Sequence, residues 1–250
     1  MAETNKIQCC DALEYLKAIP DESVALTIID PPYNISKERY KYIRGRKVTS
    51  DFGNWDHFSS HQEYKDFMSS IISEISRVSK KDASVVIWCP EQYYGLIRML
   101  VKQAGFSRTW MHYWVKSNSV PVPNRDKWRG AVECCWFGSR GQAPFNFISQ
   151  RSMVNFTIRR TVDAPERIRV DGRTAHPTQK PLDVTMKFVK IASNKGDVVL
   201  DCFIGVGTTA VAAKILGRDF LGCDNNEFFV KLAEQRLKDC DFQNSDEVRA

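Results

Sequence analysis

Residues 24–34 read Val-Ala-Leu-Thr-Ile-Ile-Asp-Pro-Pro-Tyr-Asn, so an apolar run is followed directly by an acid, two prolines and an aromatic ring. A short apolar run of this kind predicts a buried strand of a parallel sheet. Asp30 then lies at the carboxyl end of that strand, where open α/β sheets place their ligands. Pro31 and Pro32 fix the backbone and leave bare carbonyls beside the ring of Tyr33. A carboxylate and carbonyls next to an aromatic face suit the exocyclic amino group of a nucleobase.

The composition predicts one α/β domain with an insertion, because the chain has 250 residues of which 43% are hydrophobic. No run approaches the ~18 apolar residues of a membrane span, and the polar start lacks the apolar segment of a signal peptide. The eight cysteines form no Cys-x-x-Cys pair and the four histidines are scattered. We therefore expect a cytoplasmic protein (in the host cytoplasm if viral) with reduced cysteines, no metal site and no membrane association.

Positive charge is concentrated in two stretches. Between Lys116 and Lys180 there are twelve Lys and Arg against five Asp and Glu, and a second basic cluster follows the Asp30 loop. Two basic stretches that flank a base-sized site predict a polyanionic partner, although a solvated surface is the alternative for any charge run. The candidate DNA contacts are Lys37, Arg39, Arg44, Arg46, Lys47, Arg125, Arg140, Arg151, Arg159 and Arg160.

Hydrophobic periodicity predicts helices and strands along most of the chain. The expected strands cover 6–10, 24–29, 84–89, 109–116, 132–137, 197–200 and 219–223, and the expected helices cover 12–18, 61–80, 91–103, 181–193, 209–216 and 228–238. Asp11 is placed to cap the first helix. Residues 35–60 have no clean period and predict a mobile loop over the site. Residues 138–175 lose the alternation of strand and helix, which predicts an inserted subdomain.

A second constellation combines a glycine loop with an acid. Residues 201–209 place Gly205 and Gly207 between a predicted strand and a predicted helix, and Asp224 ends the next strand. Glycines let the backbone approach a ligand, and an acid at this position can accept hydrogen bonds from ribose hydroxyls. The third glycine of the dinucleotide fingerprint is absent, and so is a Gly-Lys-Ser/Thr loop. A nicotinamide dinucleotide and a nucleoside triphosphate are therefore disfavoured as ligands.

Several stretches resemble the motifs of S-adenosylmethionine-dependent DNA amino-methyltransferases. Residues 30–33 resemble their motif IV, 201–209 their motif I and 176–181 their motif X. Residues 10–13 resemble motif III with Cys10 in place of glycine, and 222–224 resemble motif II with Asp224 in place of the commoner glutamate. The catalytic motif precedes the basic region and the cofactor motif comes last, an order similar to that of the β group.

The resemblance implies a Rossmann-like methyltransferase fold, with a mostly parallel seven-stranded sheet, helices on both faces and a permuted motif order. Residues 1–138 would form the catalytic half of the domain and 176–240 the cofactor-binding half. Residues 139–175 would be a small inserted target-recognition region, and 241–250 a tail. A homodimer is plausible on the same grounds.

The resemblance also assigns roles to residues. The catalytic group would be Asp30, Pro31, Pro32 and Tyr33, with Asp30 and the Pro31 carbonyl holding the target amino group and Tyr33 stacking on the flipped base. Asp224 would take the ribose hydroxyls of S-adenosylmethionine, and Asp11 would lie near its adenine. The cofactor-binding set would be Asp11, Ala12, Asp30, Thr178, Gln179, Lys180, Asp201, Phe203, Gly205, Gly207, Thr208, Thr209 and Asp224.

The leading hypothesis is a site-specific methyltransferase of a restriction-modification type, which acts on the 6-amino group of adenine in double-stranded DNA after base flipping. Transfer to the 4-amino group of cytosine is the nearest alternative, although enzymes acting there more often carry serine at the position of Asp30. An RNA methyltransferase is a weaker alternative. A further alternative is an inactive subunit that only binds DNA, and the intact Asp30, Tyr33 and Asp224 argue against it.

Overall fold

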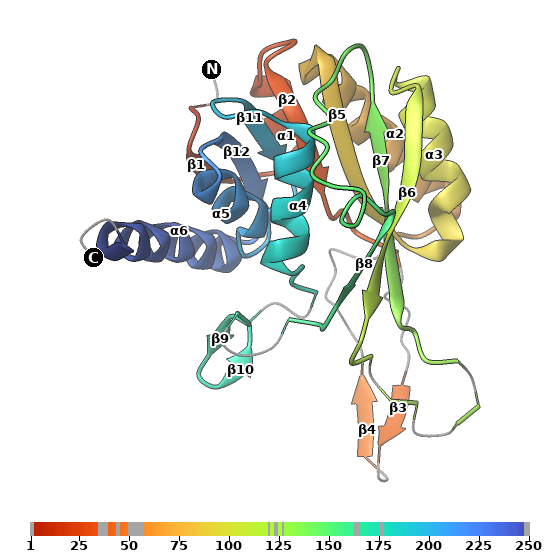
Figure 1. Ribbon diagram of the computed structural model, residues 1–250. Coiled ribbons are helices and arrows are strands. Elements are labelled where there is room, and N and C mark those ends of the chain that lie inside the picture. The colour runs from red at the N-terminus through yellow and green to blue at the C-terminus, as the bar shows by residue number, and fades with distance from the viewer. Residues whose placement is uncertain are drawn as a thin grey trace.

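The computed structural model describes residues 3–34, 40–43, 46–49, 58–119, 121–122, 125–126, 128–162, 166–175 and 178–247. Its centre is an eight-stranded sheet in the order β1-β12-β11-β2-β5-β7-β6-β8 (Figure 1). These strands are β1 (Lys6–Cys9), β2 (Val24–Ile29), β5 (Ser79–Cys89), β6 (Arg108–Lys116), β7 (Val132–Ser139), β8 (Phe156–Arg159), β11 (Val198–Asp201) and β12 (Asp219–Asp224). Two hairpins, β3 (Tyr40–Ile43) with β4 (Arg46–Thr49) and β9 (Arg169–Val170) with β10 (Arg173–Thr174), extend beyond one end of the sheet (Figure 1).

The sheet is parallel except at β7, which runs antiparallel to both β5 and β6. The predicted mostly parallel sheet is therefore confirmed, but it has eight strands where seven were expected. The additional strand is β8, which pairs in parallel with β6 and places Phe156 opposite Tyr113. It comes from the segment expected to be irregular, because four residues give too short a pattern to stand out among the surrounding polar residues.

Helices cover both faces of the sheet. One face carries α1 (Ala12–Ala18), α2 (His61–Val78) and α3 (Tyr94–Gln103), with the 3-10 turn η2 (Glu91–Tyr93) before α3. The other face carries α4 (Leu182–Ala192), α5 (Thr208–Ile215) and α6 (Glu227–Glu247) (Figure 1). Successive residues of a strand point to opposite faces, so Ile29 packs in the first core and Ile28 in the second. All six residues of β2 are buried, as expected for a central parallel strand.

The helix starts follow from local chemistry. Asp11 caps α1 as predicted, because its carboxylate accepts hydrogen bonds from the amides of Leu13 and Glu14 at 2.8 and 3.2 Å. Gly207 precedes α5 with φ 83°, a left-handed conformation. A Cβ at Gly207 would lie 2.8 Å from the Cβ of Ala233 on α6. Glycine is therefore required here both by the backbone angle and by the close approach of α6.

The last helix is longer than the sequence pattern predicted. The helix expected at 228–238 begins one residue earlier and continues to Glu247, through part of the expected tail. Within the described residues, no helix combines the length and apolar character that a membrane crossing needs. No three His, Cys, Asp or Glu side chains in that part of the chain are grouped so that they could hold a metal ion. The eight cysteines are all free thiols, and five of them are buried.

Candidate active site

A cavity of about 220 Å³ lies at the carboxyl ends of β2, β11 and β12. The four predicted catalytic residues line it, and so do the predicted cofactor residues Asp11, Ala12, Asp30, Thr178, Gln179, Lys180, Asp201, Phe203, Gly205, Thr208, Thr209 and Asp224. Gly207 is not part of the lining. It lies against Ala233 of α6 instead. The cavity thus joins the Asp30 loop to the glycine loop, two segments that lie far apart in the sequence.

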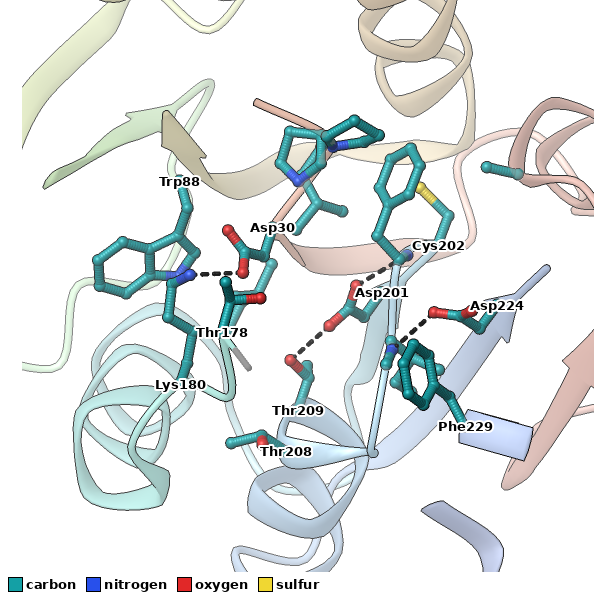
Figure 2. A pocket seen from close by; sticks show the side chains of 18 of the residues that line it. Asp30, Trp88, Thr178, Lys180, Asp201, Cys202, Thr208, Thr209, Asp224 and Phe229 are labelled. Carbon is teal, nitrogen blue, oxygen red and sulfur yellow. Dashed lines mark hydrogen bonds and ion pairs between the residues drawn. The ribbon is translucent and has the colours of Figure 1, made fainter. Parts of the chain in front are cut away.

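Asp30 faces this cavity from the end of β2. Its Oδ2 accepts a hydrogen bond from Nζ of Lys180 at 2.5 Å (Figure 2). Its Oδ1 is buried and accepts no hydrogen bond from any described residue. Burial raises the pKa of Asp30, and the ammonium of Lys180 offsets part of that rise. The side chain therefore presents one paired and one unpaired acceptor oxygen.

Lys180 connects Asp30 to a second acid. Its Nζ also lies 3.4 Å from Oε2 of Glu133 on β7, and its side chain is only 8% exposed. Burial acts to lower the pKa of Lys180, but Asp30 and Glu133 outweigh it, so the net pKa is raised and the ammonium is retained at neutral pH. Nζ lies 5.2 Å from the centre of the Trp88 ring and 5.4 Å from that of Tyr33. The sequence pattern indicated neither the pairing with Asp30 nor Glu133, although an acid at the start of an apolar strand was a usable signal.

Asp201 holds the glycine loop through hydrogen bonds to two of its residues. Its carboxylate accepts hydrogen bonds from the amide of Phe203 at 3.0 Å and from the hydroxyl of Thr209 at 2.6 Å (Figure 2). Burial raises the pKa of Asp201 to about 7, although the Thr209 and Phe203 hydrogen bonds act to lower it. Asp201 therefore fixes the turn between β11 and α5 as well as lining the cavity.

Asp224 closes the other side of the loop. Its carboxylate accepts the amide hydrogens of Gly205 and Asn226, both at 2.9 Å. Burial raises the pKa of Asp224, and these two hydrogen bonds offset part of the effect. A carboxylate has about four acceptor positions, so Asp224 retains capacity for hydroxyl donors. Phe229 of α6 lies beside it at the cavity (Figure 2) and was not predicted from the sequence.

Two further residues outside the motifs support the site. Arg236 of α6 donates to the Val206 carbonyl at 2.6 Å and to the Thr208 hydroxyl at 3.2 Å, which ties α6 to the glycine loop. Gln179 is buried and uses its amide on the backbone of residues 166 and 168. The cavity residues that the sequence pattern did not single out are Ile28, Ile29, Phe58, Phe67, Trp88, Thr185, Cys202, Ile204, Val206, Asn225, Asn226 and Phe229. Most are apolar, and nothing distinguishes them from core residues in a sequence.

Two of the arginines predicted to contact DNA, Arg140 and Arg159, are bound to other groups of the protein. Arg140 donates to the carbonyls of Ser76, Ser79 and Lys80, at the end of α2 and the start of β5. This is the opposite end of β5 from the cavity, so the position of Arg140 disfavours the predicted DNA contact and favours a capping role. Arg159 is ion-paired with Glu166 and Asp183 at 2.8 and 2.7 Å.

The other predicted DNA contacts stay predictions. Arg125, Arg151 and Arg160 are exposed. Lys37, Arg39 and Arg44 lie outside the described residues, as do the side chains of Arg46 and Lys47. The β3–β4 hairpin falls inside the segment predicted to be a mobile loop.

Comparisons with known proteins agree on one family. Residues 24–235 match the model of a family described as DNA methylase. The type II methyltransferase M1.MboII of Moraxella bovis is 29% identical over 93% of this chain and 96% of its own length. The type II methyltransferase M.HinfI of Haemophilus influenzae is 30% identical over 94% of this chain and 68% of its own length.

Solved structures show the same fold. The M1.HpyAVI–SAM complex superposes with a TM-score of 0.68 at 22% identity, over 93% of this chain and 98% of that one. The cytosine-N4-specific PvuII DNA methyltransferase superposes with a TM-score of 0.71 at 18% identity, over 94% of this chain and 86% of that one.

Proposed function

This chain belongs to the DNA methylase family, and from that premise we propose that it transfers a methyl group from S-adenosylmethionine to the 6-amino group of adenine in double-stranded DNA. The observation that carries the proposal is the shared cavity. Asp30, with an unpaired buried oxygen, and the glycine loop with Asp224 open into one space. An acceptor for an amino group is thereby placed beside a site suited to a nucleoside cofactor.

The lining residues fit S-adenosylmethionine. Four carboxylates, those of Asp11, Asp30, Asp201 and Asp224, surround the cavity, against one ammonium from Lys180. This balance suits a ligand that carries a sulfonium cation and two ribose hydroxyls. We propose that Asp224 accepts hydrogen bonds from the ribose hydroxyls, which its free acceptor positions support, and the M1.HpyAVI structure of the same fold contains the cofactor. When bound, the cofactor supplies an electrophilic methyl group on sulfur.

Asp30 and the Pro31 carbonyl act on the amino group. An adenine amino nitrogen is a poor nucleophile because its lone pair is delocalised into the ring. Two acceptors draw its hydrogens out of the ring plane, which favours a tetrahedral nitrogen with a localised lone pair. No enzyme nucleophile is required for this direct transfer, so the buried Cys89 and Cys202 have no part in it. The base has to leave the duplex to reach the cavity, and stacking on Tyr33 recovers ~1–3 kcal/mol.

DNA contacts would come from the basic segments around the cavity. Residues 139–175 are proposed as the target-recognition region, with Arg151 and Arg160 exposed on it. The basic segment 37–47 is proposed to contribute further contacts. The relatives named above are type II methyltransferases, which supports a restriction-modification role and a cytoplasmic site of action. A homodimer stays a prediction that analytical ultracentrifugation can check.

Asp30 favours adenine over cytosine, since the resemblance pairs cytosine enzymes more often with serine at this position. The cytosine alternative is retained because the fold is shared with a cytosine-N4-specific enzyme. The test is incubation of the purified protein with labelled S-adenosylmethionine and, in separate reactions, genomic DNA or RNA, followed by digestion to nucleosides and mass spectrometry. Label in N6-methyl-2′-deoxyadenosine supports the proposal, and label in N4-methyl-2′-deoxycytidine replaces it. Transfer only to RNA, or to neither nucleic acid, refutes it.

A further inference from the structure

The ammonium of Lys180 lies between two carboxylates that come from different strands. Nζ is 2.5 Å from Oδ2 of Asp30 and 3.4 Å from Oε2 of Glu133. The rings of Trp88 and Tyr33 enclose it on other sides. Because a lysine side chain has several rotatable bonds, a small rotation changes which carboxylate receives the hydrogen bond.

The hydrogen bonds of this group are incomplete. Oδ1 of Asp30 is buried and accepts no hydrogen bond within the described residues, whereas the buried Oε2 of Glu133 is held by the 3.4 Å ion pair with Lys180. An ammonium has three donors, and Lys180 makes one short hydrogen bond, to Asp30, and a longer ion pair of 3.4 Å with Glu133. Buried acceptors without donors are rare in folded proteins. The open Oδ1 of Asp30 and the longer contact of Lys180 with Glu133 indicate an arrangement that is completed by a ligand donor and a movement of Lys180.

Glu133 is a suitable second partner for Lys180. Its Oε1 is already paired with Lys116 at 2.5 Å. Burial acts to raise the pKa of Glu133, but Lys180 and Lys116 outweigh it, so the net pKa is lowered and the carboxylate is ionised at neutral pH. Two ammoniums and two carboxylates balance, and a movement of Lys180 from one acid to the other leaves the charge of the group unchanged.

We propose that Lys180 is a positioning residue that exchanges carboxylates during the reaction. Without a target base it holds Asp30 in the ionised form and in a fixed orientation. When the amino group arrives, Lys180 turns to Glu133 and leaves both oxygens of Asp30 available as acceptors. The ammonium keeps its three protons throughout, and no bond is made or broken by it. This inference rests on the proposed role of Asp30.

The exchange has a chemical purpose. A carboxylate whose charge is neutralised by an ammonium at 2.5 Å is a weak acceptor for a neutral amino group. Moving the ammonium away at the moment of base entry strengthens the acceptor where it acts on the nitrogen. Lys180 would then act on kcat more than on cofactor or DNA affinity, because its effect is expressed as the amino group is activated.

The first test is Glu133→Gln, which keeps the side-chain shape and removes the charge that receives Lys180. With duplex DNA that the wild type methylates, we expect kcat to fall about tenfold or more, while cofactor affinity by calorimetry changes less than about twofold. Glu74→Gln is the matched control, because Glu74 is another partly buried glutamate in an ion pair, with Arg77, and does not line the cavity. It should lose stability to a similar extent and keep the wild-type kcat.

A second readout is the pH profile of Lys180→Met. Removal of the ammonium leaves burial to raise the pKa of Asp30 further, so the acidic limb of kcat/KM should move to higher pH. A shift of this limb shows that the Lys180 charge acts on Asp30, and an unmoved limb overturns that coupling; the exchange itself is tested by Glu133→Gln and by the structure with DNA. The limb should stay in place in Glu74→Gln.

A crystal structure of the wild type with duplex DNA and S-adenosylhomocysteine tests the movement directly, and it decides the question if Glu133→Gln does not fold. Nζ of Lys180 closer to Glu133 than to Asp30 supports the exchange, and an unchanged pairing with Asp30 overturns it. Wild-type kcat in Glu133→Gln, together with an inactive Asp30→Ala, would refute the exchange and leave the proposed function intact. Turnover by Asp30→Ala would instead refute the proposed function itself.

Discussion

Asn34 donates a hydrogen bond from Nδ2 to the hydroxyl of Tyr93 at 3.0 Å. Asn34 has a positive φ of 52° and its Oδ1 accepts the amide of Phe58 at 3.3 Å. The Tyr93 hydroxyl is also hydrogen-bonded to Nδ1 of His61 at 2.8 Å. The residue that follows Tyr33 is thus held by η2 and by the start of α2, which fixes the loop that carries the proposed catalytic group.

Tyr93→Phe should loosen this loop. It removes two neutral hydrogen bonds, which are worth roughly 0.5–1.5 kcal/mol each, so the free energy of unfolding should fall by about 1–3 kcal/mol and methyl transfer should fall with it. Urea unfolding and initial-rate kinetics measure the two effects. Tyr113→Phe on the exposed side of β6 is the control and should change neither. Full activity and stability in Tyr93→Phe would remove Tyr93 from the support of the loop.

Asp30→Ala should abolish methyl transfer while cofactor and DNA still bind. Loss of a preorganised group that acts in the transition state costs ~10²–10³ in rate. Tyr33→Ala should weaken productive DNA binding as well as rate, because stacking on the extruded base is lost. A fluorescent base analogue at the target position distinguishes them, with a flipped-base signal in Asp30→Ala and a reduced one in Tyr33→Ala. Equal signals would contradict the stacking role.

Asp224→Ala should weaken binding of S-adenosylmethionine. A carboxylate that accepts from ribose hydroxyls makes charge-assisted hydrogen bonds worth roughly 1.5–3 kcal/mol, or about ten- to a hundredfold in affinity. Calorimetry on the folded variant measures this. Asp219→Ala, at the other end of β12, should bind the cofactor like the wild type. Unchanged affinity in Asp224→Ala would show that Asp224 only supports the glycine loop.

Arg159 and Arg160 should behave differently although they are adjacent. Arg159 pairs with Glu166 and Asp183, so Arg159→Ala should cost about 1 kcal/mol of stability and leave the salt dependence of DNA binding unchanged. Arg160 is exposed, and Arg160→Ala should reduce the slope of log affinity against log salt by about one unit. The slopes are measured by anisotropy titrations at several salt concentrations. Should both variants lose the same slope, the ion pairs of Arg159 open on DNA.

Asp201 should make stability depend on pH. Its pKa is raised by burial to about 7 in the folded protein, so between its unfolded value of about 3.9 and 7 the folded state binds the additional proton. The contribution of protonated Asp201 to the free energy of unfolding is therefore fully present below about pH 3.9, and it is lost as pH rises towards 7. Asp201→Asn should flatten this decline in thermal melts, whereas Asp219→Asn should keep it. A variant with the wild-type pH dependence would show that Asp201 is ionised in the fold.

The sequence predicted the elements well where apolar runs or helical periods were strong, as at β2 and α2. The resemblance to methyltransferase motifs also assigned the Asp30 loop and the glycine loop to one site. The sequence did not indicate β8, whose four residues are too few to give a clear pattern, or Glu133, whose partners come from distant segments. Phe229 and Arg236 lie on α6, and apolar and basic residues are common on any helix that covers a sheet. Pairings of that kind are set by the packing of elements and not by local pattern.

The pairing of β11 with β2 has a consequence for how the protein is made. β2 lies between β5 and β11 at the centre of the sheet, yet β11 is synthesised long after β2. Until residues 198–201 leave the ribosome, the nascent chain carries a largely apolar strand with an unpaired edge. Closure of the sheet, and with it the meeting of Asp30 with Asp201, has to wait for the synthesis of β11. The permuted motif order thereby lengthens the interval in which this strand edge of the nascent chain is exposed.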